Sequence, residues 1–121
     1  MQLIHHTLLL FAVLMTSTLV AQNTAAYEST LQKFQEHFNA QETDAIFELY
    51  STQAQEEMTK EGITQFVKGC YGQFGNLKEF IFIEEVENVY SYSILFEKGT
   101  LLMDIQLAPD GKITTIQLQE P

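Results

Sequence analysis

Residues 90–118 of the chain have the sequence YSYSILFEKGTLLMDIQLAPDGKITTIQL. Apolar and polar side chains alternate with a period of two along three segments of this stretch, which is typical of strands that bury one face. The segments are separated by EKGT, which contains Gly99, and by APDGK, in which Pro109 fixes φ and Gly111 can supply a positive φ. We therefore predict three strands joined as a double hairpin.

A fourth strand precedes this stretch. Residues 77–86 have the sequence LKEFIFIEEV, and the period of two places Phe80 and Phe82 on one face of the strand. Four strands with short connections form an antiparallel meander, and one face of such a sheet must be covered.

Apolar side chains recur at helical spacing nearer the N-terminus. A first helix carries a stripe at spacings of four, three and four, made of Tyr27, Leu31, Phe34 and Phe38. Thr43 is the predicted N-cap of a second helix, because its hydroxyl can accept a hydrogen bond from the first turn. The apolar face of the second helix consists of Ile46, Phe47, Leu49 and Tyr50. Residues 51–58, STQAQEEM, are predicted to be a polar helix end or a loop.

The strongest helical period follows Thr59, the predicted N-cap of a third helix. Its apolar stripe consists of Ile63, Phe66, Val67, Cys70, Tyr71 and Phe74. Gly75 fits the residue that ends a helix in the left-handed αL conformation. We expect Gly69 and Gly72, inside this helix, to allow a close approach to the sheet or to weaken the last turn. The predicted fold class is α+β, with three N-terminal helices packed on one face of a four-stranded antiparallel meander sheet.

The N-terminus has the pattern of a secretory signal peptide. The apolar run Leu8–Met15 is followed by TSTLVA and by a small residue, Ala21, and cleavage there would leave a chain that begins at Gln22. A membrane-spanning helix is the alternative, but such a helix needs ~20 apolar residues, and polar residues interrupt this run. We therefore expect residues 1–21 to be a signal peptide, residues 22–121 to be one domain, and the mature protein to be secreted or periplasmic.

The charge balance excludes several classes of partner. Sixteen acidic residues stand against six lysines and no arginine, and the formal net charge is −10. Such a surface repels nucleic acid and anionic membranes, and it lacks the guanidinium groups that grip phosphates. Cations, neutral apolar molecules and basic protein surfaces remain as partner classes. The single cysteine, Cys70, cannot form an internal disulfide.

Three segments give the chain a resemblance to a known family. They are FNAQETDAIFELYS (38–51), QFGNLKEF (73–80) and FEKGTLLMDIQLAPDGKI (96–113). From residue 27 to residue 118 the chain resembles the domain-of-unknown-function family numbered 3887, which belongs to the NTF2-like, cystatin-like group of cone-shaped α+β domains. The resemblance implies this fold but no catalytic residues. Because members also occur beside secreted hydrolase domains, it also suggests an accessory partner of a separate secreted hydrolase.

Aromatic residues on the helices and on the strand at residues 90–96 form the candidate ligand pocket, and packing in the core is the alternative interpretation. The candidate residues are Phe38, Tyr50, Phe66, Cys70, Tyr71, Phe74, Tyr92 and Phe96. The thiol of Cys70 is expected to pack as a small apolar group, because the C-terminal end of a helix disfavours a thiolate. The sequence predicts no catalytic set, no metal site and no cofactor.

Two classes of function follow. The first is a non-catalytic domain that binds a small apolar ligand or a partner protein, as a homodimer through the open face of the sheet. The second is an isomerase or hydratase in which Asp104 or His37 acts as the base and a tyrosine as the oxyanion donor. The period of two argues against Asp104, because it places this carboxylate on the face opposite Met103 and Ile105.

Overall fold

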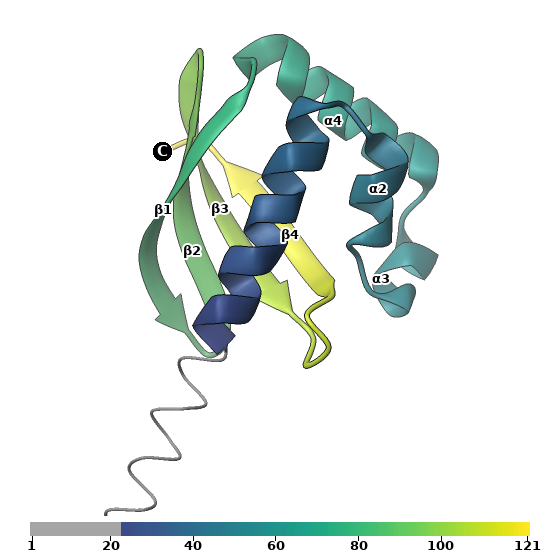
Figure 1. Cartoon of the computed structure of the whole chain (residues 1–121), viewed down its shortest axis with the longest axis vertical. Coiled ribbons are helices and arrows are strands. Elements are labelled where there is room, and N and C mark those ends of the chain that lie inside the picture. The colour runs from purple at the N-terminus through teal and green to yellow at the C-terminus, as the bar shows by residue number, and fades with distance from the viewer. Residues whose placement is uncertain (1–22) are drawn as a thin grey trace, which may run out of the picture.

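Helices and strands occupy separate halves of residues 23–121, which are the residues that the computed structural model describes (Figure 1). The predicted signal peptide, residues 1–21, lies outside this described part. The first helix covers residues 23–39 and is followed by α2 (Thr43–Glu48), α3 (Thr52–Glu57) and α4 (Lys60–Phe74). No helix in this part of the chain has the length and apolar character needed to cross a lipid bilayer.

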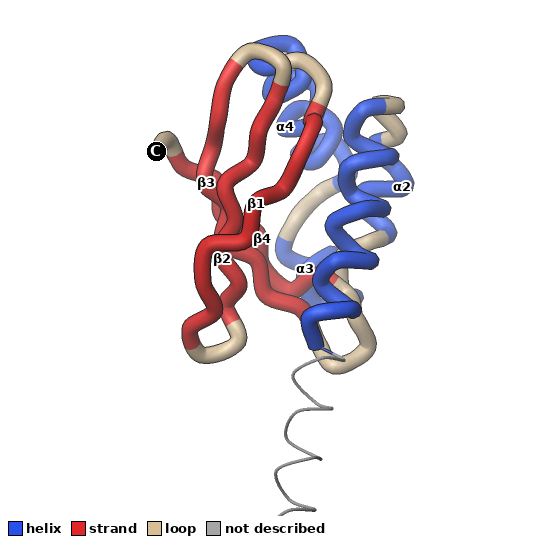
Figure 2. The backbone as a smooth tube through the Cα atoms, turned by 60° about the vertical axis from the view of Figure 1, so that its left-hand side comes forward, coloured by secondary structure: helices blue, strands red, loops and turns tan. Residues whose placement is uncertain are grey.

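The second half is a four-stranded antiparallel sheet with the strand order β1-β2-β3-β4. Its strands are β1 (Leu77–Val86), β2 (Val89–Phe96), β3 (Gly99–Leu107) and β4 (Ile113–Gln119). Each strand pairs with the next one along the chain, so the predicted meander is confirmed. Figure 2 shows the helices on one side of the sheet, and no described element covers the other face. The predicted α+β fold class is also confirmed, and the arrangement is compatible with an NTF2-like cone.

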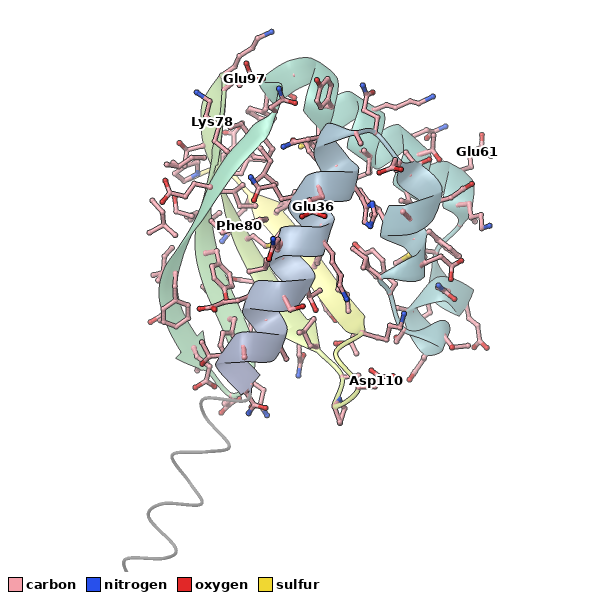
Figure 3. All side chains as sticks on the ribbon, viewed as in Figure 1. Glu36, Glu61, Lys78, Phe80, Glu97 and Asp110 are labelled. Carbon is pink, nitrogen blue, oxygen red and sulfur yellow. The ribbon has the colours of Figure 1, made fainter. Side chains whose placement is uncertain are left out.

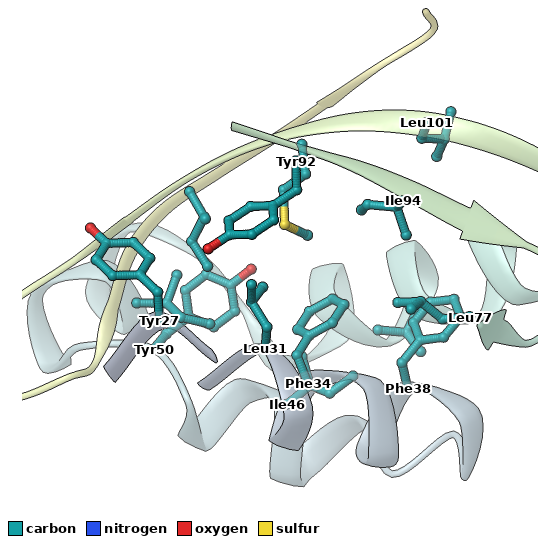
Figure 4. Close-up of a cluster of buried hydrophobic side chains, with 14 of the residues drawn as sticks. Tyr27, Leu31, Phe34, Phe38, Ile46, Tyr50, Leu77, Tyr92, Ile94 and Leu101 are labelled. Atoms are coloured by element: carbon teal, nitrogen blue, oxygen red, sulfur yellow. The ribbon is translucent and has the colours of Figure 1, made fainter. Parts of the chain in front are cut away.

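The core lies between the inner face of the sheet and the helices (Figure 4). Along β2, buried side chains alternate with half-buried ones, as the period of two predicts. The stripe of the first helix is also buried and consists of Tyr27, Leu31, Phe34 and Phe38. Val67 of α4 and Met103 of β3 have no exposed surface. Because each large apolar side chain contributes about 1.5–3 kcal/mol when fully buried, this interface holds the helices on the sheet.

Residues 51–58 contain a separate helix, α3, which the sequence analysis treated as a polar helix end or a loop. The Oγ of Ser51, its N-cap, accepts a hydrogen bond from the backbone N–H of Ala54 at 3.1 Å. Ala54 is the buried residue of this helix, and a single small side chain gives almost no apolar period. The fold therefore has one helix more than the three that the sequence predicted.

The start of α2 also differs from the prediction. Thr43 is the first residue of this helix, and Glu42 occupies the N-cap without a side-chain hydrogen bond to the helix. The Oγ1 of Thr43 accepts a hydrogen bond from Thr64 Oγ1 at 3.2 Å, which joins α2 to α4. A tertiary contact thus uses the hydroxyl that was expected to cap the helix.

Helix α4 begins as predicted, because Thr59 Oγ1 accepts the backbone N–H of Gly62 at 2.9 Å. It ends at Gly75, whose φ of 79° and ψ of −154° lie outside the expected αL conformation, in a region that is essentially restricted to glycine. The expected close approach at Gly69 and Gly72 is wrong. A Cβ atom at either glycine would meet no atom within 4 Å, so neither is required by a neighbour.

The two edges of the sheet are covered to different degrees. The backbone N–H of Ile113 in β4 donates to the carbonyl of Leu49 at 2.9 Å, and the N–H of Ser51 donates to the carbonyl of Ile113 at 2.9 Å. Tyr50 therefore lies in a parallel bridge with β4, and not on α2 as predicted. Strand β1 has no such backbone partner along its outer edge within the described chain, and residues 81–86 are all exposed.

Candidate functional site

A cleft opens between the first helix and β1. It has a volume of about 420 Å³, which lies within the usual range for small-molecule sites. Figure 3 shows Phe80 on β1, beside the first helix. The lining residues of the cleft include Glu28, Leu31 and Gln32 from the helix, Phe80 and Phe82 from β1, and Tyr90 and Tyr92 from β2. We call this site the β1 cleft.

Four aromatic residues line the sheet side of the β1 cleft: Phe80 and Phe82 from β1, and Tyr90 and Tyr92 from β2. The centroid of the Tyr92 ring lies 5.6 Å from that of Phe82 and 6.1 Å from that of Phe80, and both pairs are edge-to-face. Phe82 retains 53 % of its surface exposed, although it lies opposite Tyr92 on the inner face of the sheet. An aromatic ring that is half exposed beside a cleft offers apolar surface that a ligand can cover.

The two ends of the first helix are fixed to different parts of the sheet, and the cleft lies along its side. At the C-terminal end, Asn39 Nδ2 donates to the carbonyl of Leu77 at 2.9 Å, and Asn39 Oδ1 accepts the N–H of Leu77 at 2.7 Å. At the other end, the hydroxyl of Tyr27 donates to the carbonyl of Asn88 at 2.9 Å and accepts the N–H of Leu107 at 3.0 Å. These bonds hold the helix in place without filling the cleft.

Strand β1 is irregular beside the cleft. Its pairing with β2 shifts register between Leu77 and Glu79 and again between Phe82 and Glu84. Such irregularities bend and twist a strand. The β1–β2 turn then reverses the chain at Glu87 and Asn88, which have φ values of 51° and 67°. Positive φ at both central residues is the requirement of a two-residue hairpin turn that matches the twist of its strands.

Tyr92 is one of the two tyrosines that line the cleft. Only 5 % of its surface is exposed, and its hydroxyl makes no hydrogen bond with another described residue. Burial, together with smaller contributions from the charges of Tyr90, Glu28 and Tyr27, raises the pKa of Tyr92 to about 12. The phenol is therefore neutral at physiological pH and can donate or accept a hydrogen bond.

Charged and amide groups surround the opening of the β1 cleft. Glu28 stands on the helix side, and Lys78 and Glu79 stand on the β1 side. The amide of Gln35, which also lines the cleft, already donates to the carbonyls of Leu77 and Lys78 at 3.0 and 3.1 Å. The lining groups therefore include two carboxylates and one ammonium.

A second cavity of about 400 Å³ lies between α3, α4 and β4. We call it the β4 cavity, and its lining residues include Tyr50, Met58, Ile63, Phe66, Ile116 and Leu118. Burial raises the pKa of Tyr50 to about 12. Phe66 is 39 % exposed at this cavity, and Glu57 is its one ionisable side chain besides Tyr50. The β4 cavity is therefore less charged than the β1 cleft.

The structure divides the predicted pocket residues into three groups. Tyr92 lines the β1 cleft, whereas Tyr50 and Phe66 line the β4 cavity. The others pack against the core, as the alternative interpretation had it, and they are Phe38, Cys70, Tyr71, Phe74 and Phe96. The ring of Phe96, for example, lies 5.7 Å from that of Phe38 and 5.4 Å from that of Phe74. The eight residues thus do not line one common pocket.

The residues considered for catalysis lie apart from each other. Asp104 is on the open face of the sheet, where its Oδ1 accepts a hydrogen bond from Ser91 Oγ at 2.7 Å. His37 is on the first helix, which packs on the other face, and its Nδ1 lies 3.2 Å from Glu42 Oε1. Neither residue lines the β1 cleft or the β4 cavity. The sheet therefore separates the two proposed bases.

Cys70 is half-buried against the core, and burial raises the pKa of its thiol. A raised pKa lowers the fraction of thiolate, which is the nucleophilic form. Within residues 23–121, no three His, Cys, Asp or Glu side chains come together in a way that could hold a metal ion. The chemistry that the β1 cleft offers is therefore apolar contact, hydrogen bonding by the phenols of Tyr90 and Tyr92, and interaction with fixed charges.

Sequence reasoning missed most of the β1 cleft, including Glu28, Gln32, Phe80 and Phe82. Two signals were present in the sequence. Glu28, Gln32 and Gln35 recur at spacings of four and three, which places a polar stripe directly beside the apolar one. The run FIFI at residues 80–83 places apolar side chains on both faces of one strand, although only one face of this sheet is covered.

Comparison with protein-family models gives one match, to the family described as "Protein of unknown function (DUF3887)", over residues 32–116. This match covers more than half of the chain. The chain belongs to the DUF3887 family. No curated protein and no solved structure matches it. The resemblance stated from three sequence segments is thereby confirmed.

The DUF3887 match includes both sides of the β1 cleft. It begins at Gln32 on the first helix, runs through Phe80, Phe82 and Tyr92, and ends in β4. Glu28 and Leu31, which line the helix side, precede the matched residues. The cleft is therefore built mainly from the part of the chain that defines the family.

Proposed function

We propose that this DUF3887 domain is a non-catalytic binding module that takes a small apolar ligand in the β1 cleft. The observation that carries the proposal is the half-exposed ring of Phe82 beside Tyr92, whose hydroxyl has no partner among the described residues. Apolar walls with a few polar groups are typical of small-molecule sites. Asp104 and His37, the two candidate bases, are absent from the cleft, which favours binding over catalysis.

Export of the domain is part of this proposal. The support is the apolar run Leu8–Met15 followed by Ala21, a pattern typical of cleaved signal peptides. We expect the exported protein to begin at Gln22, which mass spectrometry of its N-terminal peptide would show. A mature protein that retains Met1 would contradict this part of the proposal.

The binding proposal can be tested with a neutral fluorescent probe, N-phenyl-1-naphthylamine. We expect the full chain to bind it with an increase in fluorescence, and Phe82→Ala to weaken binding by about tenfold, because the ring supplies exposed apolar surface. Phe66→Ala is the matched control, since Phe66 is also partly exposed but lines the β4 cavity. If Phe66→Ala weakens binding and Phe82→Ala does not, the β4 cavity is the site and the proposal for the β1 cleft is wrong.

A second candidate function is self-association through the open face of the sheet. Ile81 and Val86 are 44 % and 57 % exposed, and Leu102 lies half-buried on the same face as Ile81, two strands away. Apolar side chains on an uncovered sheet favour contact with a partner surface. We expect sedimentation of the full chain to show a dimer that Leu102→Glu converts to a monomer, whereas a monomeric parent chain would refute this candidate.

A further inference from the structure

We propose that the ligand of the β1 cleft is an organic cation, a small apolar molecule that carries one protonated amine. This inference rests on the binding function proposed above and adds the charge of the ligand. Three features of the cleft support it, namely a hydroxyl without a partner, an excess of negative charge and exposed aromatic surface.

The hydroxyl of Tyr92 is the first feature. The residue is 5 % exposed and lines the cleft, and its hydroxyl makes no hydrogen bond with any residue from 23 to 121. In the same part of the chain, no fully buried polar side-chain atom lacks a hydrogen-bond partner. The hydroxyl oxygen of Tyr92 is therefore not fully buried. Because Tyr92 lines the cleft, a ligand in the cleft can reach this oxygen. Such an oxygen can accept a hydrogen bond from an ammonium group.

The second feature is the charge around the opening. Glu28 and Glu79 line the helix side and the β1 side of the cleft, and Lys78 is the one cation among the lining residues. The charge of Glu28 acts on Tyr92, since it contributes to the raised pKa of that residue. An ammonium between Glu28 and Tyr92 could donate to both. A ligand carboxylate in this place would be repelled by Glu28, with Lys78 alone to attract it.

The aromatic surface is the third feature. Four aromatic residues line the cleft, namely Phe80, Phe82, Tyr90 and Tyr92, and Phe82 is the most exposed of them. The faces of aromatic rings attract cations, and apolar carbon atoms of a ligand pack on the same surface. A volume of about 420 Å³ accommodates an amine with an alkyl or aryl body. The composition of the whole chain agrees with this choice, since its net charge is −10.

The test uses three molecules of equal length that differ in one terminal group: octylamine, 1-octanol and octanoate. Their affinities for the full chain are measured by isothermal titration calorimetry at neutral pH. We expect protonated octylamine to bind about tenfold more tightly than 1-octanol, and octanoate to bind most weakly. Glu28→Gln should reduce the preference for octylamine over 1-octanol to about threefold or less.

Glu36→Gln is the control, because it removes the same charge from an exposed position of the same helix that does not line the cleft. An equal loss of preference in both variants would mean that only the net charge attracts the amine, and this would overturn the inference. Equal affinities for octylamine and 1-octanol would also overturn it, while the proposed apolar binding function would stand. If none of the three molecules binds, the binding function and the inference both fail.

Discussion

The two edge strands of this sheet differ in how the chain covers them. Strand β4 makes two backbone hydrogen bonds with the segment before α3, one as donor and one as acceptor, and α3 packs beside it. Strand β1 is held at its start by Asn39 and Gln35, and its second half is exposed on both faces. The β4 edge of the sheet is therefore covered by the chain itself, whereas the β1 edge is uncovered and provides the candidate binding surface.

The largest expected effect comes from the covered edge. Ile113 in β4 has no exposed surface, so Ile113→Ala should lower the free energy of unfolding by about 2–5 kcal/mol, the range for such truncations in a core. The comparable change on the uncovered edge is Ile81→Ala, where 44 % of the side chain is already exposed and the loss should stay below about 1 kcal/mol. Urea unfolding of both variants measures the difference, and equal losses would contradict the contrast between the edges.

A smaller effect is expected where β1 is held at its start. Asn39→Ala removes two hydrogen bonds to the backbone of Leu77, which is buried at 1 % exposure; the Leu77 carbonyl keeps the bond from Gln35, but its N–H loses its acceptor. Because buried backbone groups without partners are costly, the free energy of unfolding should fall by about 1–3 kcal/mol. Hydrogen exchange should show faster exchange of the Leu77 amide. Unchanged exchange at this amide would show that Asn39 does not fix the strand.

The smallest expected effects concern two tyrosines, one at each edge. The pKa of Tyr50 in the β4 cavity and that of Tyr92 in the β1 cleft are each raised from 10.0 to about 12, mainly by burial. The folded state therefore favours the neutral phenols, and stability that is fully present below pH 10 should be lost as the pH rises toward 12. Tyr50→Phe and Tyr92→Phe should each reduce this loss, as measured by urea unfolding across the same pH range.

Glu28→Gln should change the pKa of only one of the two tyrosines. It should lower the pKa of Tyr92, because the charge of Glu28 helps to raise it, and it should leave the pKa of Tyr50 unchanged. Because the chain has five tyrosines, both values are obtained by difference, from spectrophotometric titration of each protein with and without Tyr50→Phe or Tyr92→Phe. Equal shifts of the two pKa values would show that Glu28 has no specific contact with the β1 cleft.

The sequence was sufficient to predict the meander, because each strand carries its own period of two and each turn its own Gly or Pro. The hairpin over Glu87 and Asn88 is the exception, since its positive φ values occur at residues other than glycine. Helix α3 was not predicted as a separate helix, because Ala54 is its one buried side chain and a single residue gives no apolar period. Tyr50 was assigned to α2 because residues 46–50 have a helical apolar pattern, although a backbone bridge to β4 sets its actual place.

The site was less predictable than the fold. Periodicity places aromatic residues on a common face, but it does not show which of them are covered by other side chains. Phe38 and Phe96 contact each other and belong to the core, whereas Phe82 remains half exposed beside the cleft between the first helix and β1. Whether an aromatic face is filled or open depends on the relative positions of helix and strand, which the hydrogen bonds of Tyr27 and Asn39 set.

The exposed half of β1 has a further consequence for how the protein behaves in concentrated solution. An apolar edge strand is a template for pairing with other chains, and charges on the strand are a common protection against aggregation. Glu84, Glu85 and Glu87 follow the run at residues 80–83 directly, so chains that approach edge to edge repel each other at neutral pH. In a variant that replaces these three glutamates with glutamine, the edge of β1 is where fibrous or amorphous aggregates should begin.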